Sequence, residues 1–121
     1  MYEKFEKWAD KFLENGFPEE VVAANFNFYE DADNNWSIEI VGTASFDEDD
    51  EDWAGDEVTD LGSRDELFSE ELEKEWDEVL EVFLDYVRKY LEQGRYADTL
   101  KELTAVGAGF VDGDLEILYK K

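Results

Sequence analysis

The sequence predicts an α+β domain: an antiparallel sheet of about four strands, arranged as two hairpins, with an N-terminal helix and a long central helix packed on one face. Three observations lead to this prediction. Apolar residues recur at helical spacing near the N-terminus and again in the second half, they alternate with polar residues between these segments, and turn-forming residues separate the strand-like segments in pairs. The 121 residues, 43% of them hydrophobic, suit one domain over residues 1–121.

The first predicted element is a helix over residues 2–15. Its apolar residues lie three and four positions apart, which places them on one helical face: Phe5, Trp8, Ala9, Phe12 and Leu13. Gly16 is a typical helix stop, and Pro18 prevents continuation of the helix.

Two hairpins supply the predicted strands. Residues 24–29 and 36–40 alternate between apolar and polar side chains around the turn-rich EDADNN, and strand character continues through VGTASF. Near the C-terminus, AVGAGFV and LEILY flank Asp112-Gly113-Asp114, and an Asp-Gly turn between apolar segments is typical of a hairpin. Gly107 and Gly109 indicate a bulge or a close backbone approach within it.

A long amphipathic helix is predicted over Ser69–Gln93, followed by a short helical segment at YADTLKEL. At 1.5 Å per residue the long helix would span about 37 Å. Ser63 with Glu66, or Ser69 followed by two Glu, could cap its start. Trp8, Trp36 and Trp76 are predicted to be core residues, and Tyr96 is predicted to pack beneath the short helix.

Acidic residues dominate the charge and are unevenly distributed. The chain has 35 Asp and Glu against 11 Lys and Arg, a formal net charge of −24. The 52 residues between Lys11 and Arg64 hold 16 acids and no base. Such a field repels nucleic acid and anionic lipid and attracts basic partners. We therefore expect a basic protein partner, and neither a nucleic acid nor a membrane.

Composition also argues against most enzyme and cofactor classes. The chain has no Cys and no His, which removes disulfides, thiol nucleophiles, histidine bases and the usual zinc ligands. It contains no phosphate-binding or dinucleotide-binding glycine motif. A non-enzymatic protein without a cofactor is predicted, and a two-carboxylate hydrolase remains an alternative. The lack of a signal peptide at MYEKFEKW and of a long apolar segment predicts cytoplasmic residence.

A dedicated calcium site is not predicted. An EF-hand loop needs glycine at its sixth position. Loops that start at Asp31 or Asp47 instead have Trp36 or Asp52 there. Weak divalent-cation binding by the carboxylates of residues 47–52 stays open.

The segment FDEDDEDWAGDEVTD, residues 46–60, holds nine carboxylates around one tryptophan. It could be a solvated loop that keeps the protein soluble, with Trp53 turned into the core. Alternatively, the loop and the first hairpin form an anionic docking surface on which Trp53 is an aromatic anchor. The charge asymmetry favours docking, because solubility alone needs less charge. The predicted partner-binding residues are Glu30, Asp31, Asp33, Asp49, Asp50, Asp52, Trp53, Asp56, Glu57 and Asp60.

Three segments, WAGDEV (53–58), YLEQGRYADTLKEL (90–103) and VGAGFVDGDLEILY (106–119), together with the acidic composition, give the chain a likeness to a known class. It resembles the small immunity proteins encoded beside bacterial polymorphic and contact-dependent-inhibition toxins. The resemblance implies an inhibitor whose acidic face occludes the basic cleft of a cognate toxin domain, a nuclease. The alternatives are an acidic adaptor or nucleic-acid mimic, and a weak divalent-cation-binding domain.

Overall fold

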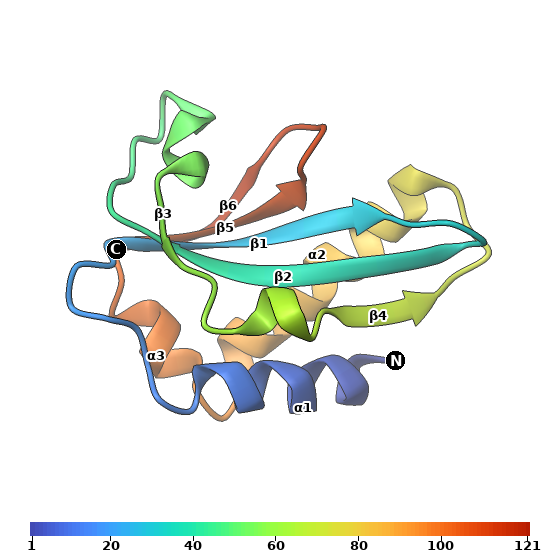
Figure 1. Ribbon diagram of the computed structural model, residues 1–121, viewed down its shortest axis with the longest axis horizontal. Coiled ribbons are helices and arrows are strands. Elements are labelled where there is room, and N and C mark those ends of the chain that lie inside the picture. Colours follow the sequence, from blue (N-terminus) through green and yellow to red (C-terminus); the bar gives the residue numbers. More distant parts are fainter.

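The computed structural model describes all 121 residues as three α-helices and a six-stranded mixed sheet (Figure 1). The helices are α1 (Tyr2–Leu13), α2 (Trp76–Gln93) and α3 (Ala97–Lys101). The strands are β1 (Ala23–Glu30), β2 (Asn35–Thr43), β3 (Glu57–Thr59), β4 (Phe68–Glu71), β5 (Ala105–Phe110) and β6 (Glu116–Lys120). Two short 3-10 helices, η1 (Glu51–Gly55) and η2 (Ser63–Asp65), flank β3. The predicted α+β class is confirmed.

The sheet is larger than predicted, and it is mixed rather than antiparallel. Its order is β3-β2-β1-β5-β6, and β4 pairs with another part of β2. Both predicted hairpins form, but β1 and β5 run parallel, with Ala23 opposite Ala105. The parallel pair arises because the chain passes through α2 and α3 before it returns beside β1, as a parallel connection requires.

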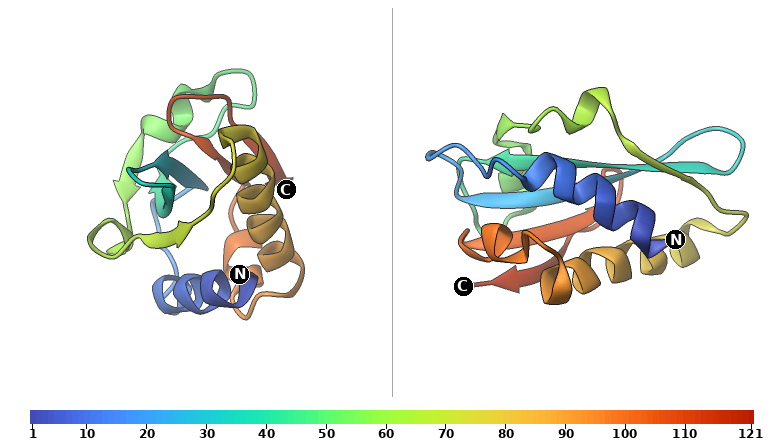
Figure 2. Two further views of the ribbon diagram at one scale, coloured as in Figure 1. Left: turned by 90° about the vertical axis from the view of Figure 1, so that its right-hand side faces the viewer. Right: turned by 90° about the horizontal axis from the view of Figure 1, so that it is seen from below.

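The core lies between the sheet and the helices, which all cover one face (Figure 1; Figure 2, right). Strand alternation turns Phe26, Ile38 and Val106 toward this layer, where they join a cluster of 21 buried residues. Phe5 of α1 is completely buried, and its ring stands edge-on to that of Phe68 at 5.5 Å between centroids. Trp8 and Trp36 are core residues as predicted, with exposures of 8% and 2%.

The predicted start of the long helix is wrong. Residues 68–71 form β4 instead, with Phe68 opposite Ile38, and α2 begins only at Trp76. Pairing with β2 satisfies backbone groups of that strand and buries Phe68, which a helix over the same residues would not do. Neither proposed serine cap forms. The Ser63 hydroxyl accepts a hydrogen bond from the Ile40 amide at 2.9 Å and donates one to its carbonyl at 3.0 Å.

Trp76 is a second correction. Because the helix begins at this residue, the ring lies at the end of α2 and is 59% exposed rather than buried. Its one aromatic neighbour is Phe110, edge-on at 6.5 Å. Tyr96, in contrast, is half-buried against the core beside α3, as predicted.

The C-terminal hairpin agrees with its prediction. The turn at Asp112-Gly113-Asp114 joins β5 and β6, and the register shifts between Val106 and Gly107. A Cβ on Gly107 would lie 2.7 Å from Asn25 Oδ1, and one on Gly109 would lie 2.5 Å from the Asp114 carbonyl oxygen. Both glycines therefore permit the close approach that the sequence indicated.

Candidate functional site

The candidate site lies on the face of the sheet that the helices leave open. On this face β1 turns three polar side chains outward, at Asn25, Asn27 and Tyr29, between the buried residues of the opposite face. Glu39 of β2, opposite Asn27, points to the same side. Loop 44–56, with η1, and the β5–β6 hairpin rise on either side of this polar strip (Figure 1).

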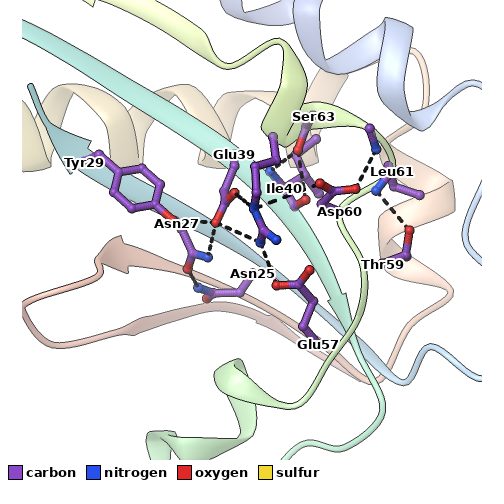
Figure 3. Close-up of polar contacts among 12 residues, drawn as sticks. Asn25, Asn27, Tyr29, Glu39, Ile40, Glu57, Thr59, Asp60, Leu61 and Ser63 are labelled. Carbon is purple, nitrogen blue, oxygen red and sulfur yellow. Dashed lines mark hydrogen bonds and ion pairs between the residues drawn. The ribbon is translucent and has the colours of Figure 1, made fainter.

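Glu39 is the centre of a polar network on this face (Figure 3). Its carboxylate is 2% exposed and accepts hydrogen bonds from Asn27 Nδ2 at 3.0 Å, Tyr29 Oη at 2.5 Å and Arg64 Nε at 2.9 Å. Arg64 Nη2 also donates to Glu57 Oε1 at 2.6 Å. The buried carboxylate is thus fully satisfied, and a single arginine ties β2 to β3.

The turn between β3 and η2 positions Arg64. Leu61 and Gly62 both have left-handed backbone conformations, with φ of 56° and 86°. Two side chains stabilise this turn: Thr59 Oγ1 accepts from the Leu61 amide at 3.0 Å, and Asp60 Oδ1 accepts from the Gly62 amide at 2.9 Å (Figure 3). The guanidinium is therefore directed over the sheet by a defined turn.

The ionisation states follow from these contacts. Burial raises the pKa of the Glu39 carboxyl, but hydrogen bonds from Arg64, Tyr29 and Asn27 outweigh it and hold that pKa below its usual value. Burial, with the bond to Glu39, raises the pKa of Tyr29 to about 12. Hydrogen bonds to Glu57 and Glu39 raise the pKa of Arg64. At neutral pH the network holds a carboxylate, a neutral phenol and a guanidinium, so none of these groups is poised to exchange a proton.

Trp53 holds the acidic loop onto the sheet. Its ring is 4% exposed and packs with Ala23 and Ala105 in a small cluster separate from the main core. Phe46 covers it edge-on, with ring centroids 5.1 Å apart. The ring is therefore buried, although outside the main core, and it is not displayed as an exposed anchor.

Polar contacts fix the rest of the loop. Glu51 Oε2 accepts from the Leu115 amide at 3.0 Å, and Lys120 Nζ donates to Glu48 at 2.6 Å. Asp50 caps η1 by accepting from the Asp52 amide at 3.0 Å. The first two contacts join the loop to the β5–β6 hairpin, so the two walls of the site are connected.

A hollow of about 620 Å³ lies between these walls. Asn27, Tyr29 and Glu39 contribute to its floor, and Arg64 is its one basic residue. Three further carboxylates reach it from the loop and β3: Glu51, Asp52 and Glu57. The hollow is thus predominantly anionic, and its arginine is already paired.

The predicted partner-binding residues fall into two groups. One lies at the β1–β2 turn, and the other follows residues 49–60 near the opposite end of β1. The two groups approach each other across the open face, because Asp52 of the loop and Tyr29, next to Glu30, line the same hollow. The turn group is exposed and consists of Glu30, Asp31 and Asp33. The loop group consists of the exposed Asp49, Asp50, Asp52, Asp56 and Glu57, the half-buried Asp60 and the buried Trp53.

Most of these carboxylates have no basic partner. Among the 16 acids between Lys11 and Arg64, only four form ion pairs: Glu39, Glu57 and Asp60 with Arg64, and Glu48 with Lys120. No group of three or more potential metal-ligating side chains is close enough to hold a metal ion. The surface therefore presents dispersed negative charge.

Sequence reasoning missed the polar strip and Arg64. The signal was present in part, since Asn25, Asn27 and Tyr29 occupy every second position of a predicted strand, which places them on one face. Arg64 is also the first base after the base-free segment. Its contact with Glu39, 25 residues away, could not be read from local spacing.

Comparison of the chain with known protein families, with curated proteins and with solved structures finds no match. No helix combines the length and apolar character needed to cross a membrane.

Proposed function

We propose that this protein is a non-enzymatic inhibitor that binds a basic protein through the open face of its sheet and the acidic loop. The observation that carries the proposal is the ordered, largely unpaired negative charge of that face, where the one arginine is already saturated by carboxylates. Repulsion among such charges destabilises the folded state, and a positive partner would relieve it.

Preorganisation supports docking over solubility alone. Trp53 is buried beneath the loop, and Glu48 and Glu51 are bonded to the β5–β6 hairpin. A loop that is already ordered pays less conformational entropy when a partner binds.

The resemblance to immunity proteins suggests a cognate toxin domain as the partner. A nuclease fits best, because its nucleic-acid-binding cleft carries the positive charge that an acidic face could occlude. The proposal places the protein in the cytoplasm, where the nucleic acid attacked by such a toxin is found.

The test is co-purification of the tagged chain with the product of its neighbouring gene, followed by association kinetics at low and high salt. The double variant Asp49→Lys/Asp52→Lys reverses two exposed loop acids and leaves the capping residue Asp50 in place. Glu92→Lys/Glu102→Lys is the matched control, with the same charge change at exposed positions of the helix layer.

We expect the loop variant to slow association at least tenfold at low salt, the control to change it little, and high salt to reduce the difference. Equal rates for the loop variant and the wild type at low salt would refute the docking surface. Binding of many unrelated basic proteins with equal affinity would instead indicate a general acidic adaptor.

A further inference from the structure

A second hollow, of about 520 Å³, is lined by the end of β1, the β5–β6 hairpin and the first turns of α2. The hairpin and the start of α2 lie side by side in Figure 2, left. Its volume is within the range of roughly 300–1,000 Å³ found for ligand pockets. The apolar part of the wall consists of Phe28, Trp76, Leu80, Phe110 and Val111. Tyr29 lines this pocket and also the anionic hollow on the open face, so the two are neighbours.

Trp76 distinguishes this pocket from the rest of the surface. The other three tryptophans are 2–8% exposed, whereas Trp76 is 59% exposed. Val111, across the pocket on the hairpin, is 49% exposed. Large exposed apolar side chains that gather in a hollow typically mark an interaction site.

The rim of the pocket carries four carboxylates and no base. Glu30 is the last residue of β1 and Asp31 begins the β1–β2 turn, whereas Asp112 and Asp114 come from the β5–β6 turn. None of them forms an ion pair within the chain, although Asp31 accepts a hydrogen bond from Ser37 Oγ at 2.7 Å. An aromatic and apolar wall under an anionic rim is complementary to a cation that also has an apolar or planar body.

We propose that this pocket receives an arginine side chain of the basic partner, together with an adjacent apolar side chain. The guanidinium is planar and weakly hydrated, so it can stack on the Trp76 indole while the rim carboxylates accept its hydrogen bonds. Lysine has a strongly hydrated point charge and lacks the planar face. The net charge of −24 makes a second copy of this chain an unfavourable occupant.

This inference rests on the proposed function and assigns its partner a specific contact. The pocket uses Glu30 and Asp31 of the predicted binding residues and adds Trp76, Asp112 and Asp114, which the sequence did not indicate as functional. The loop acids would speed association, and the pocket would select one arginine-bearing segment.

The test uses three short probes: acetyl-Leu-Arg-Leu-amide, its lysine analogue and its citrulline analogue, which has almost the same shape as arginine but no charge. Each is titrated into the isotope-labelled full chain at low salt, and the indole signal of Trp76 and the amide signals of residues 110–114 are followed by NMR. We expect the arginine peptide to bind at least tenfold more tightly than the citrulline peptide and several-fold more tightly than the lysine peptide.

Two variants locate the contact. Trp76→Ala removes an exposed ring, and we expect it to weaken binding of the arginine peptide about three- to tenfold. Asp112→Asn/Asp114→Asn should weaken it to a similar extent. The control Asp98→Asn/Glu102→Gln removes the same charge from the helix layer and should have little effect.

Equal affinity for the arginine and citrulline peptides would overturn the inference, because the occupant would then not be cationic. Shifts confined to residues 47–60, or unchanged affinity in Trp76→Ala, would also overturn it and would leave the proposed function standing. If the peptides behave as expected but no basic protein co-purifies, the proposed function fails separately.

Discussion

Replacing Trp53 with alanine tests whether this ring holds the acidic loop in place. A buried aromatic side chain removes about 150–250 Å² from water, worth roughly 4–6 kcal/mol at about 25 cal/mol per Å² as an upper bound. The cluster around Trp53 is small, and its outer members Phe46, Ala54 and Leu115 are only partly buried, so the site can relax after truncation. We therefore expect Trp53→Ala to lower the free energy of unfolding by about 3 kcal/mol, at the lower end for such substitutions.

The assay combines urea unfolding with amide hydrogen exchange. The amide of Ala44 donates to the Asp56 carbonyl, and the amide of Asp56 donates to the Trp53 carbonyl. If the loss of stability is confined to the loop, hydrogen exchange at these two amides should accelerate by up to about 100-fold. Trp76→Ala is the control, because its exposed ring should contribute less than about 0.5 kcal/mol. A change below about 1 kcal/mol in Trp53→Ala, with loop exchange unaltered, would show that Trp53 does not hold the loop onto the sheet.

Three other measurements examine the network and the charge. Glu39→Gln should lower the free energy of unfolding by about 2 kcal/mol at pH 7, because Arg64 loses its charged partner and one of the two acceptor oxygens becomes an amide donor. The native pKa of Glu39 is depressed, so the ionised carboxylate stabilises the fold fully above about pH 4.3, and this stabilisation is lost as the pH falls through the native pKa. Urea unfolding should therefore show the difference in stability between the wild type and Glu39→Gln shrinking in acid. Gly107→Ala should cost about 1–3 kcal/mol by thermal melting, because its Cβ would lie 2.7 Å from Asn25 Oδ1, whereas Gly55→Ala, with open space around it, should change Tm little. Raising salt from about 20 to about 500 mM should raise Tm, because it screens repulsion within a chain of net charge −24, and an unchanged Tm would show that this repulsion is negligible.

Elements defined by local periodicity were predictable from the sequence. The helix of residues 2–13, both hairpins and the short helix α3 all appear close to the expected positions. The parallel pairing of β1 with β5 was not predictable, because it joins segments about 80 residues apart. Strand β4 was also missed, because SEELEKEW, at residues 69–76, has helix-forming composition and only its pairing with β2 makes the first part extended.

At the candidate site the exposure of the acids was predictable, but the roles of the tryptophans were not. The sequence allowed Trp53 either a core or an anchor role, and it favoured Trp76 for the core. In the structure Trp53 is only 4% exposed, whereas Trp76 is 59% exposed. The difference arises from the true start of α2 and from Ala23 and Ala105, small residues that leave room for the Trp53 indole on the open face.

The β5–β6 hairpin contacts the acidic loop and also lines the pocket. Replacing Trp53 or Trp76 should therefore affect peptide binding and loop exchange differently. Glu51 and Glu48 fasten the loop to the β5–β6 hairpin, and the tip of the same hairpin forms a wall of the pocket. Loosening the loop by Trp53→Ala should therefore also weaken arginine-peptide binding, although Trp53 does not line the pocket. Trp76→Ala should weaken peptide binding without accelerating amide hydrogen exchange in the loop. Peptide affinity in Trp53→Ala that matches the wild type would show that the hairpin holds its position without the loop.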